Sequence, residues 1–552
     1  MMQASYTGFI SRVEWSWLSR MMATLLVVTF LPWVIATIVT SANADWQFMG
    51  VLHQVDSGAA DLSRMMQGNY GDWLMQLKHS PQAHPGILIQ PIYALLGHIA
   101  AFTGISNILI YHLMRVIATL IMYSALYQLG ASIWAKVRAR RVFFLLCAVG
   151  SGLGWLSALI GGDMTTPDML APSAFPYFAS LSNLQYPLAI ACVAMIAAVF
   201  VSVLRPGFIQ KPNVNNGGTV MFVLVIGLAA LHPPALLPLV GAFAFCVVLG
   251  WIRSRSVHEH DSRWVLWAIV PALPIGAYFA ALVTSNPVVP LWFAQTIVPR
   301  FNVLEMIIGF AWLWFIGSPA IARAFRYFEQ DGDRFMLVWL IFTVGLVLLP
   351  ISLSPAFLLA MVIPLAYFAT RALESTWLPR VSRRWQRRLF VIGIFLLSIG
   401  PLFVTFVPLI PFLQGQDSRN ASILEQDYVK AADWVANQQL SDAVVLAAPT
   451  ISRWIPAIAD VRVIYGHPSE TMYADQQRAQ ALMWLQSTDV SVCSSLQKIQ
   501  LTPIGNYYVG FILRGREERQ LGLGTCLDKW QVAQTFNTVE VLTCDATCRA
   551  GE

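Results

Sequence analysis

The sequence predicts a mostly α-helical, polytopic membrane protein with a C-terminal α/β domain outside the cytoplasm. Hydrophobic residues make up 57% of its 552 residues and charged residues only 12%, about half the roughly 25% of an average soluble domain. Charged residues return after about residue 414. A soluble globular protein of this size is therefore excluded, and so are collagen-like, coiled-coil and disordered chains.

Apolar runs of roughly 17 to 24 residues, long enough to cross a bilayer as a helix, recur along the chain. We expect spans near residues 22–41, 107–130, 142–161, 186–205, 264–284, 302–320, 335–351, 353–371 and 389–411. The longer run 219–252 contains Leu231-His232-Pro233-Pro234 near its middle. Because proline interrupts a helix, this run predicts a helical hairpin or a broken pair of helices.

Lys and Arg cluster between the apolar runs, and such clusters are typical of cytoplasmic loops. The clusters are Arg12/Arg20, Lys136/Arg138/Arg140/Arg141, Arg205/Lys211, Arg253/Arg255/Arg263, Arg323/Arg326/Arg334 and Arg380/Arg383/Arg384/Arg387/Arg388. They lie on one side only if the run 86–104 does not cross, so we expect an interfacial or re-entrant helix there. The prediction is about eleven crossings with the N-terminus inside. The net charge of +6 thus reflects topology rather than nucleic-acid binding.

The first apolar run follows Arg12 and Arg20 without a clear cleavage site, so we expect it to remain as the first helix. Under this topology four segments share the outer face: 42–106, 162–185, 285–301 and 412–552. Residues that act on an outer substrate are expected in these segments.

The chain is expected to divide into a transmembrane domain, residues 1–413, and an extracytoplasmic α/β domain, residues 414–552. In the second domain the pattern predicts a helix over 428–436 and strands over 443–447 and 507–513. Four cysteines lie there and are able to form disulfides in an oxidising compartment, with the pairing left open: Cys493, Cys526, Cys544 and Cys548.

The first outer loop, residues 42–85, is long for a membrane protein, and long ordered loops are usually functional. It carries four carboxylates: Asp45, Asp56, Asp61 and Asp72. Partial burial near a membrane raises the pKa of a carboxyl group towards neutral pH, which suits a general base. The alternative is that these acids are solvated or cap helices.

Several short motifs together resemble the GT-C glycosyltransferases. In the first part of the chain they are Asp56, Gly71-Asp72-Trp73, His84-Pro85, Leu96-Gly97 and Arg115. Further along they are Ser151-Gly152-Leu153-Gly154-Trp155, Asp168, Phe175, Asn183-Leu184-Gln185-Tyr186-Pro187, Ile455-Pro456-Ala457, Tyr465 to Thr471 and Tyr508 to Arg519. The resemblance implies a GT-C-like transmembrane domain in a bacterial cytoplasmic (inner) membrane, with a periplasmic C-terminal domain. It also implies inverting transfer of a sugar from a polyprenyl-phosphate donor to an acceptor on the outer face.

In such a transfer a carboxylate deprotonates or orients the acceptor hydroxyl, and cationic groups stabilise the departing lipid phosphate. The first choice for the carboxylate is Asp56, with Asp61 and Asp45 behind it. The candidates for donor-phosphate binding are cations near the outer face: Arg115, Lys78, His84 and Arg300. Two alternatives stay open, since Arg115 is also placed to anchor its helix at the bilayer edge and His84 to cap an apolar run.

Three further residues are candidates for substrate binding: His232, His467 and Glu470. His232 lies at the break in the run 219–252, and an ionisable residue at membrane depth is a functional candidate. Its alternative role is to bond a carbonyl that the prolines leave free. His467 and Glu470 lie in a polar loop that either reaches an active-site cavity or forms a turn before a helix over 474–485.

Some residues depart from the family pattern. The first loop has no Asp-x-Asp or Glu-x-Asp pair, so we expect no metal site and no cofactor. The segment Leu349 to Pro355 lacks the arginine that relatives often place there, and Gln185-Tyr186 stands where relatives tend to have Pro-His. A member that kept the fold and lost the activity would have such departures.

Three functions therefore compete. The first is a membrane glycosyltransferase that uses a lipid-linked sugar. The second is a non-catalytic GT-C-like subunit that binds a partner complex or a lipid. The third, a transporter, is disfavoured because the spans lack paired intramembrane carboxylates and a visible inverted repeat.

Overall fold

The computed structural model describes residues 9–204, 214–296, 299–328, 333–414, 421–438, 443–502, 504–522 and 524–543. Cys544 and Cys548 lie outside these residues. The chain forms two compact units. Unit 1 consists of Met1–Leu31, Met114–Tyr278 and Val298–Val407, and unit 2 of Pro32–Leu113, Phe279–Ile297 and Pro408–Glu552. The predicted domain boundary at residues 413 and 414 stays a prediction.

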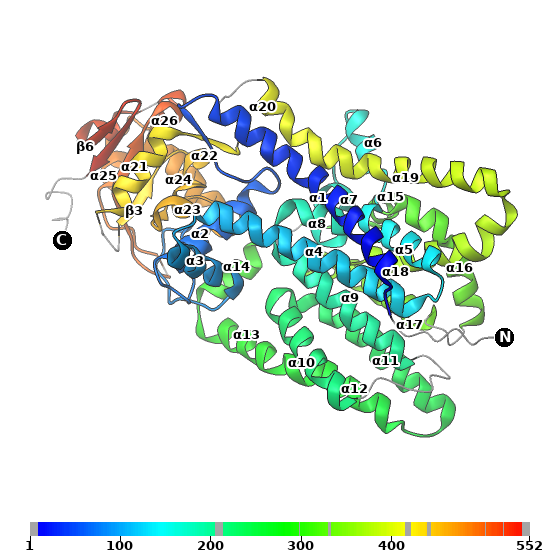
Figure 1. The fold of residues 1–552 in the computed structure, drawn as a ribbon. Helices are drawn as coiled ribbons and strands as arrows, with labels where there is room; N and C mark the ends of the chain where they lie inside the picture. Colours follow the sequence, from blue (N-terminus) through cyan, green and yellow to red (C-terminus); the bar gives the residue numbers. More distant parts are fainter. Residues whose placement is uncertain are drawn as a thin grey trace. The chain divides into compact units, whose positions relative to one another are not determined.

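The described residues of unit 1 form helices joined by turns and loops, and none of them forms a strand (Figure 1). Three helices belong to both units: α1 (Arg12–Ser41), α4 (Asn107–Ile133) and α13 (Leu273–Ser285). The other helices of unit 1 are α5 (Val137–Val149), α6 (Gly154–Leu159), α7 (Pro167–Leu170), α8 (Pro176–Ser182), α9 (Gln185–Leu204), α10 (Val214–Leu231), α11 (Leu236–Ser254), α12 (Glu259–Ile269), α15 (Val303–Gly309), α16 (Ala311–Tyr327), α17 (Asp333–Val347), α18 (Val362–Ala372) and α19 (Arg383–Phe406). Shorter helical turns are η1 (Pro172–Ala174), η2 (Pro233–Ala235), η3 (Val270–Ala272), η4 (Ser354–Leu358), η5 (Leu373–Trp377) and η6 (Leu378–Arg380).

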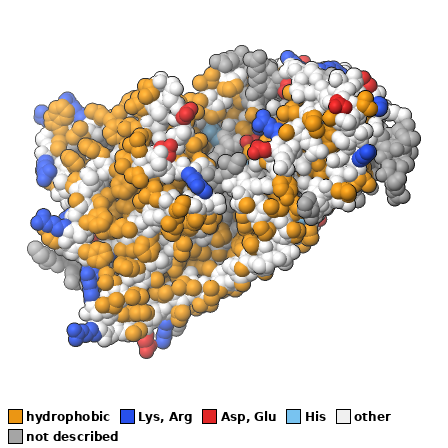
Figure 2. Space-filling model, turned by 180° about the vertical axis from the view of Figure 1, so that it is seen from behind, with side chains coloured by type: hydrophobic (Ala, Val, Ile, Leu, Met, Phe, Trp, Pro, Cys, Tyr) orange, Lys and Arg blue, Asp and Glu red, His pale blue; other side chains and the backbone are white. Residues whose placement is uncertain are grey.

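Eight helices among the described residues are long and apolar enough to cross a membrane, and the pair α15 and α16, bent by 95°, would make a ninth. Hydrophobic side chains are exposed over large areas of the surface (Figure 2), as lipid-facing helices require. The chain is thus a multi-pass membrane protein. The expected count of about eleven crossings is not confirmed.

The predicted break in the run 219–252 is confirmed. The helix α10 ends at Leu231, and the turn η2 begins at Pro233. The run 86–104 forms the helix α3 (Pro91–Thr103), which has 13 residues. A helix of that length is too short to span a bilayer of ordinary thickness.

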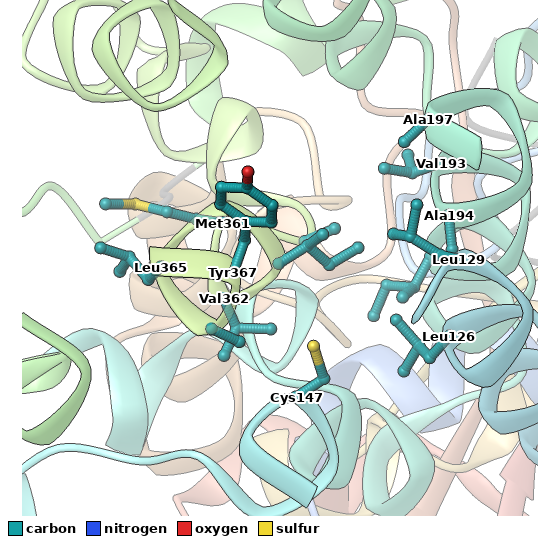
Figure 3. Packing of buried hydrophobic residues seen from close by; sticks show 14 of the residues in the cluster. Leu126, Leu129, Cys147, Val193, Ala194, Ala197, Met361, Val362, Leu365 and Tyr367 are labelled. Carbon is teal, nitrogen blue, oxygen red and sulfur yellow. The ribbon is translucent and has the colours of Figure 1, made fainter. Parts of the chain in front are cut away.

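Part of the core of unit 1 is formed by side chains of α4, α5, α9 and α18 (Figure 3). Leu126 of α4, Cys147 of α5 and Leu365 of α18 are fully buried there. On α9 the contact residues include Ala194 and Ala197. Small side chains let helix backbones approach closely, which suits helix packing within a membrane.

Unit 2 combines short helices with all the strands that the structure describes. Its helices are α2 (Val55–Asn69), α3, α14 (Val288–Gln295), α20 (Ile410–Gln414), α21 (Gln426–Ala436), α22 (Pro449–Ser452), α23 (Ile455–Ala459), α24 (Ala474–Gln486), α25 (Val490–Leu496), α26 (Arg516–Gln520) and η8 (Thr525–Lys529), with η7 (Val407–Leu409) at the boundary. Its strands are β1 (Trp46–Phe48), β2 (Ile423–Glu425), β3 (Ala443–Leu446), β4 (Arg462–Val463), β5 (Tyr508–Arg514), β6 (Gln531–Phe536) and β7 (Val539–Thr543).

Five of these strands form a mixed sheet in the order β4-β3-β5-β7-β6. The strand β3 is parallel to β4 and β5, and β7 is antiparallel to β5 and β6. A disulfide joins Cys493 to Cys526, 33 residues apart, within the hydrophobic cluster that also contains residues of β3 and β5. The strands expected over 443–447 and 507–513 are β3 and β5, so the predicted α/β character of this region is confirmed.

The first outer segment packs closely on itself and pairs with the C-terminal segment. In β1 and β2, Trp46 is the antiparallel partner of Glu425. The helices α2 and α3 touch at backbone distance, because a Cβ atom on Gly97 would lie 2.0 Å from the carbonyl oxygen of Met65. Only glycine fits at this crossing, which gives the Leu96-Gly97 motif a structural reason.

Candidate functional site

The helix α2 carries the two main candidate carboxylates of unit 2. It begins after Gln54, whose φ of 49° is left-handed. Asp56 lies in its first turn, where the helix dipole favours a negative charge. Asp61 lies one and a half turns further on and is buried. The loop 466–471 brings His467 and Glu470 to the same cluster.

A buried ion network joins α2 to that loop. The Arg64 guanidinium pairs with Asp61 through Nη1 and Oδ1 at 3.2 Å, and its Nη2 donates to Glu470 Oε1. His79 Nδ1 lies 3.4 Å from Glu470 Oε2. All four side chains are at most 9% exposed. Burying charge is costly unless it is paired, so the network fixes the loop 466–471 to α2.

Neutral hydrogen bonds hold the same loop on the segment that follows α2. The Thr471 hydroxyl donates to the carbonyl of His79 at 2.6 Å, and the Met472 amide donates to Ser80 Oγ at 3.0 Å. His467 Nδ1 accepts from the amides of Ser469 and Glu470 at 2.9 and 3.0 Å. An Nδ1 that accepts carries no proton, so His467 is neutral in this arrangement.

Burial and pairing move the pKa values of the cluster in different directions. Burial raises the pKa of Asp61 to about 7, although Arg64 opposes the shift. Burial would also raise the pKa of Glu470, but Arg64, His79 and His467 outweigh it and hold that pKa below its usual range. Asp61 therefore titrates near neutral pH, while Glu470 stays charged.

Asp61 also has an unused acceptor. The hydroxyl of buried Tyr93 lies near enough to lower the pKa of Asp61. Within the described residues, however, neither Asp61 Oδ2 nor the Tyr93 hydroxyl makes a hydrogen bond of normal geometry. The two groups are thus poised to bond each other after a small movement of either side chain.

Asp56 and Arg453 form the accessible edge of this cluster. Arg453 Nε lies 2.5 Å from Asp56 Oδ1, and the two side chains are 20% and 39% exposed. The carbonyl of Arg453 accepts from His79 Nε2 at 3.0 Å, so Arg453 joins Asp56 to the buried network. A group that reacts with a substrate must be accessible, and among these residues that condition favours Asp56 over Asp61.

Three further candidate residues of unit 2, Asp45, Lys78 and His84, bind partners outside the network of Asp61, Arg64 and Glu470. Asp45 is exposed, and its carbonyl accepts from the amide of Gln426. Lys78 pairs with Asp460 at 3.4 Å. His84 accepts from the amide of Leu77 through Nε2 and donates to the carbonyl of Pro85 through Nδ1, each at 2.8 Å. Both ring nitrogens of His84 are therefore used by the backbone.

The remaining three candidates lie in unit 1. Arg115 is buried, donates through Nη1 to the carbonyl of Leu181 at 3.1 Å, and lies over the ring of Phe30. His232 donates through Nε2 to the carbonyl of Ala356 in η4 at 2.7 Å, a carbonyl outside the run 219–252, so its two roles from the sequence stay predictions. Arg300 is exposed between α14 and α15.

Sequence reasoning missed Arg64, Arg453 and Tyr93. Arg64 follows Asp61 by three residues, which is the spacing of an ion pair on one helix face. That signal was available once a helix was assigned to this loop. Among the described residues, no group of three or more His, Cys, Asp and Glu side chains is arranged to hold a metal ion. The expected absence of a metal site stays a prediction.

The titration of His467 makes the stability of the fold depend on pH. Burial lowers the pKa of His467 from 6.5 to about 4, although Glu470 opposes the shift. Between these pH values the unfolded chain binds a proton that the folded chain does not, so the free energy of unfolding falls as the pH falls through this window. The loss attributable to His467 is at most roughly 3 kcal/mol.

The variant His467→Asn should lose less stability than the wild type over this window, because the amide oxygen still accepts from Ser469 and Glu470 but does not titrate. Thermal unfolding in detergent between pH 6.5 and 4 measures this. Asp61, whose pKa is raised, acts in the opposite direction in both proteins, so the difference between them isolates His467. Equal slopes in the two proteins would contradict the expectation.

Comparisons with known proteins place the fold. No family model matches the chain, and no curated protein matches it.

ArnT from Cupriavidus metallidurans bound to undecaprenyl phosphate matches with a TM-score of 0.53 and 14% identity, over 98% of this chain and 99% of that chain. Arabinofuranosyltransferase AftD from Mycobacteria matches with a TM-score of 0.55 and 11% identity, over 97% of this chain and 42% of that chain. The Archaeoglobus fulgidus oligosaccharyltransferase in the apo form has a TM-score of 0.47 and 12% identity, over 90% and 69%. At these identities the likeness to ArnT and AftD is one of fold.

Proposed function

We propose that this chain, which has the GT-C glycosyltransferase fold, transfers a sugar from a polyprenyl-phosphate donor to an acceptor on the outer face of the membrane. The observation that carries the proposal is an accessible carboxylate, Asp56, held by Arg453 at the edge of a buried ion network. ArnT, whose structure contains undecaprenyl phosphate, supports a lipid-phosphate donor.

Asp56 is the group we assign to the acceptor. The acceptor oxygen attacks the anomeric carbon of the sugar while its proton passes to the Asp56 carboxylate. The bond between that carbon and the phosphate oxygen breaks, and the electron pair leaves with the polyprenyl phosphate. Attack opposite to the leaving group inverts the anomeric configuration.

Arg453 is the cation we assign to the phosphate, in addition to the candidates from the sequence. Its guanidinium is part-exposed and already lies beside Asp56. A guanidinium forms charge-assisted, bidentate bonds with phosphate oxygens and so stabilises the negative charge that develops on them. Lys78 is the next candidate, since it is 15% exposed and would first have to leave Asp460.

Asp61, Arg64 and Glu470 are positioning residues in this scheme. They are too deeply buried to touch an acceptor, but they hold the loop 466–471 and α2 together. Since Asp56 and Asp61 belong to the same helix, the network also fixes the helix that carries the reacting carboxylate. Preorganisation of this kind reduces the reorganisation that the reaction requires.

The C-terminal α/β region is proposed to lie outside the cytoplasm, on the face where the donor headgroup is presented. The disulfide between Cys493 and Cys526 supports this, because such bonds persist in oxidising compartments. The membrane we propose is the cytoplasmic membrane of a bacterium, as the resemblance to the GT-C glycosyltransferases implies. The acceptor and any protein partner stay open.

One observation favours the second candidate function, a non-catalytic subunit. Asp56 and Asp61 are each paired with an arginine of the same chain. In a scaffold these pairs would be purely structural, and the departures from the family pattern would record a lost activity. The two functions differ in whether polyprenyl phosphate is released.

The deciding experiment uses the full chain, purified and reconstituted in liposomes with a panel of polyprenyl-phosphate-linked hexoses and pentoses. A bacterial envelope extract supplies acceptors, and released polyprenyl phosphate is measured by mass spectrometry. Release that requires both protein and acceptor supports the proposal. Absence of release from every donor, with folded protein present, contradicts it and favours the non-catalytic subunit.

A further inference from the structure

A basic groove in unit 1 has no part in the proposed transfer. It is lined by Lys136, Arg138, Glu374, Leu378, Pro379 and Gln386, and its volume is about 290 Å³. Two segments far apart in the sequence form it: the connection from α4 to α5, and the turns η5 and η6 with the start of α19. The fold therefore gathers two of the basic clusters of the sequence into one place.

The charge around this groove is strongly unbalanced. Residues 136–141 and 374–388 contain nine Lys and Arg but a single acid, Glu374. Arg140 forms an ion pair with Glu14, with 3.0 Å between Nη1 and Oε1, and the Arg141 guanidinium lies over the ring of Trp17. Among the side chains that the structure describes, the exposed cations of these two segments are Lys136, Arg138, Arg380, Arg383, Arg384 and Arg388, and the first two line the groove.

Within the groove, Glu374 neutralises only one of these cations. Its Oε1 accepts from Arg138 Nε at 2.8 Å, and Glu374 itself is 18% exposed. The carboxylate therefore occupies the position that an incoming anion would take on Arg138. A phosphate group that displaced it would also meet Lys136, the other cation that lines the groove.

Apolar side chains lie in the groove and are exposed further along α19. Leu378 and Pro379 line the groove itself. Trp385 is 54% exposed near the start of α19, and exposed tryptophan is typical of the membrane–water interface. Further along α19, Val391 and Phe395 are 67% and 66% exposed. An anion with a hydrocarbon tail would use both parts of this surface, whereas a soluble anion would use only the cations.

We propose that this groove binds the headgroup of an anionic phospholipid, with the acyl chains along the exposed apolar face of α19. Basic pockets between membrane helices on the cytoplasmic side bind such headgroups through charge-assisted bonds. The positive-inside rule places both basic segments on that side. The site is independent of the proposed sugar transfer, because none of its residues belongs to the Asp56 cluster.

The test measures lipid retention on the purified, delipidated chain by native mass spectrometry. Phosphatidylglycerol and phosphatidylcholine with identical acyl chains are titrated separately. We expect phosphatidylglycerol to bind more tightly. The double variant Lys136→Gln/Arg138→Gln should weaken its binding by about tenfold or more, since each cation near an anionic lipid contributes substantially.

Two matched variants separate a specific site from general surface charge. Arg263→Gln/Arg326→Gln removes two cations from other basic clusters, one of them paired with an acid, Glu259, as Arg138 is with Glu374. This pair should leave binding unchanged. Glu374→Gln should strengthen phosphatidylglycerol binding, because it releases Arg138 and removes the competing carboxylate. Damage to the fold would not produce tighter binding.

Three results would overturn the proposal. The first is equal retention of the two lipids by the wild type. The second is a loss of binding in Arg263→Gln/Arg326→Gln as large as in the groove variant, or no gain in Glu374→Gln. The third is full displacement of phosphatidylglycerol by excess inorganic phosphate, which would make the groove a site for a soluble phosphate.

Discussion

Replacing Asp56 with Asn should lower sugar transfer by about 10² to 10⁴-fold, the usual contribution of a general base. The amide has nearly the volume of the carboxylate and lies at the same place beside Arg453, but it does not take the acceptor proton. The effect should fall on kcat rather than on donor binding. It is measured as released polyprenyl phosphate in the liposome assay, with the unfolding temperature as a check on folding.

The matched control is Asp72→Asn. Asp72 lies in the same outer segment, is exposed and is not among the candidate bases, so its loss should leave transfer unchanged. Wild-type transfer in Asp56→Asn would remove Asp56 from the reaction and turn attention to Asp61 and Asp45. A loss in both variants would indicate a general effect of charge in this segment rather than a specific base.

Replacing Arg64 with Met should cost about 3–5 kcal/mol of stability, because it leaves a buried charge without its partner. Glu470 is 7% exposed and depends on Arg64 for its pairing. Unfolding in detergent, followed by the intrinsic tryptophan fluorescence of the chain, measures the loss. Transfer should fall with it, since the loop 466–471 would leave α2.

The double variant Arg64→Met/Glu470→Met should recover much of this stability. Replacing both partners of a buried ion pair with apolar side chains of similar volume is often close to neutral. Asp61 then titrates with a still higher pKa and is neutral in the folded protein. Wild-type stability in Arg64→Met alone would show that the network does not hold the loop.

The sequence predicted the helix breaks and strands that depend mainly on neighbouring residues. The break at His232 followed from the two prolines after it, and the strand β3 followed from a short apolar run. The helix α2 was missed because its buried face carries polar side chains, including Asp61 and Arg64. Every residue from Gly58 to Met65 is buried, polar and apolar alike, so burial in this helix does not follow one apolar face.

Long-range pairing could not be predicted from one sequence. Arg64 and Glu470 are 406 residues apart, and nothing local to either residue specifies the other. The same holds for Arg453 and Asp56. Lys78 was placed near the membrane by the pattern of runs, but its contact with Asp460 depends on the folded C-terminal region.

The number of spans was uncertain from sequence for a geometric reason. A hydropathy window does not detect a bend, so the run 302–320 looks like one helix although α15 and α16 meet at 95°. It also counts a run such as 335–351 at its full apolar length, although the helix α17 (Asp333–Val347) ends before the run does. The length of an apolar run in the sequence is therefore a weaker guide to the number of membrane spans than the length of the helix that forms.

The most direct test of the Asp56 site is photo-crosslinking with an undecaprenyl phosphate that carries a diazirine on the isoprene next to the phosphate. If the donor phosphate binds beside Asp56 and Arg453, the labelled peptides should come from α2 and from residues 453–470. Excess unlabelled undecaprenyl phosphate should compete, and Asp56→Asn should still crosslink while transfer is lost. Labelling confined to peptides of unit 1, with none from α2 or residues 453–470, would contradict the account.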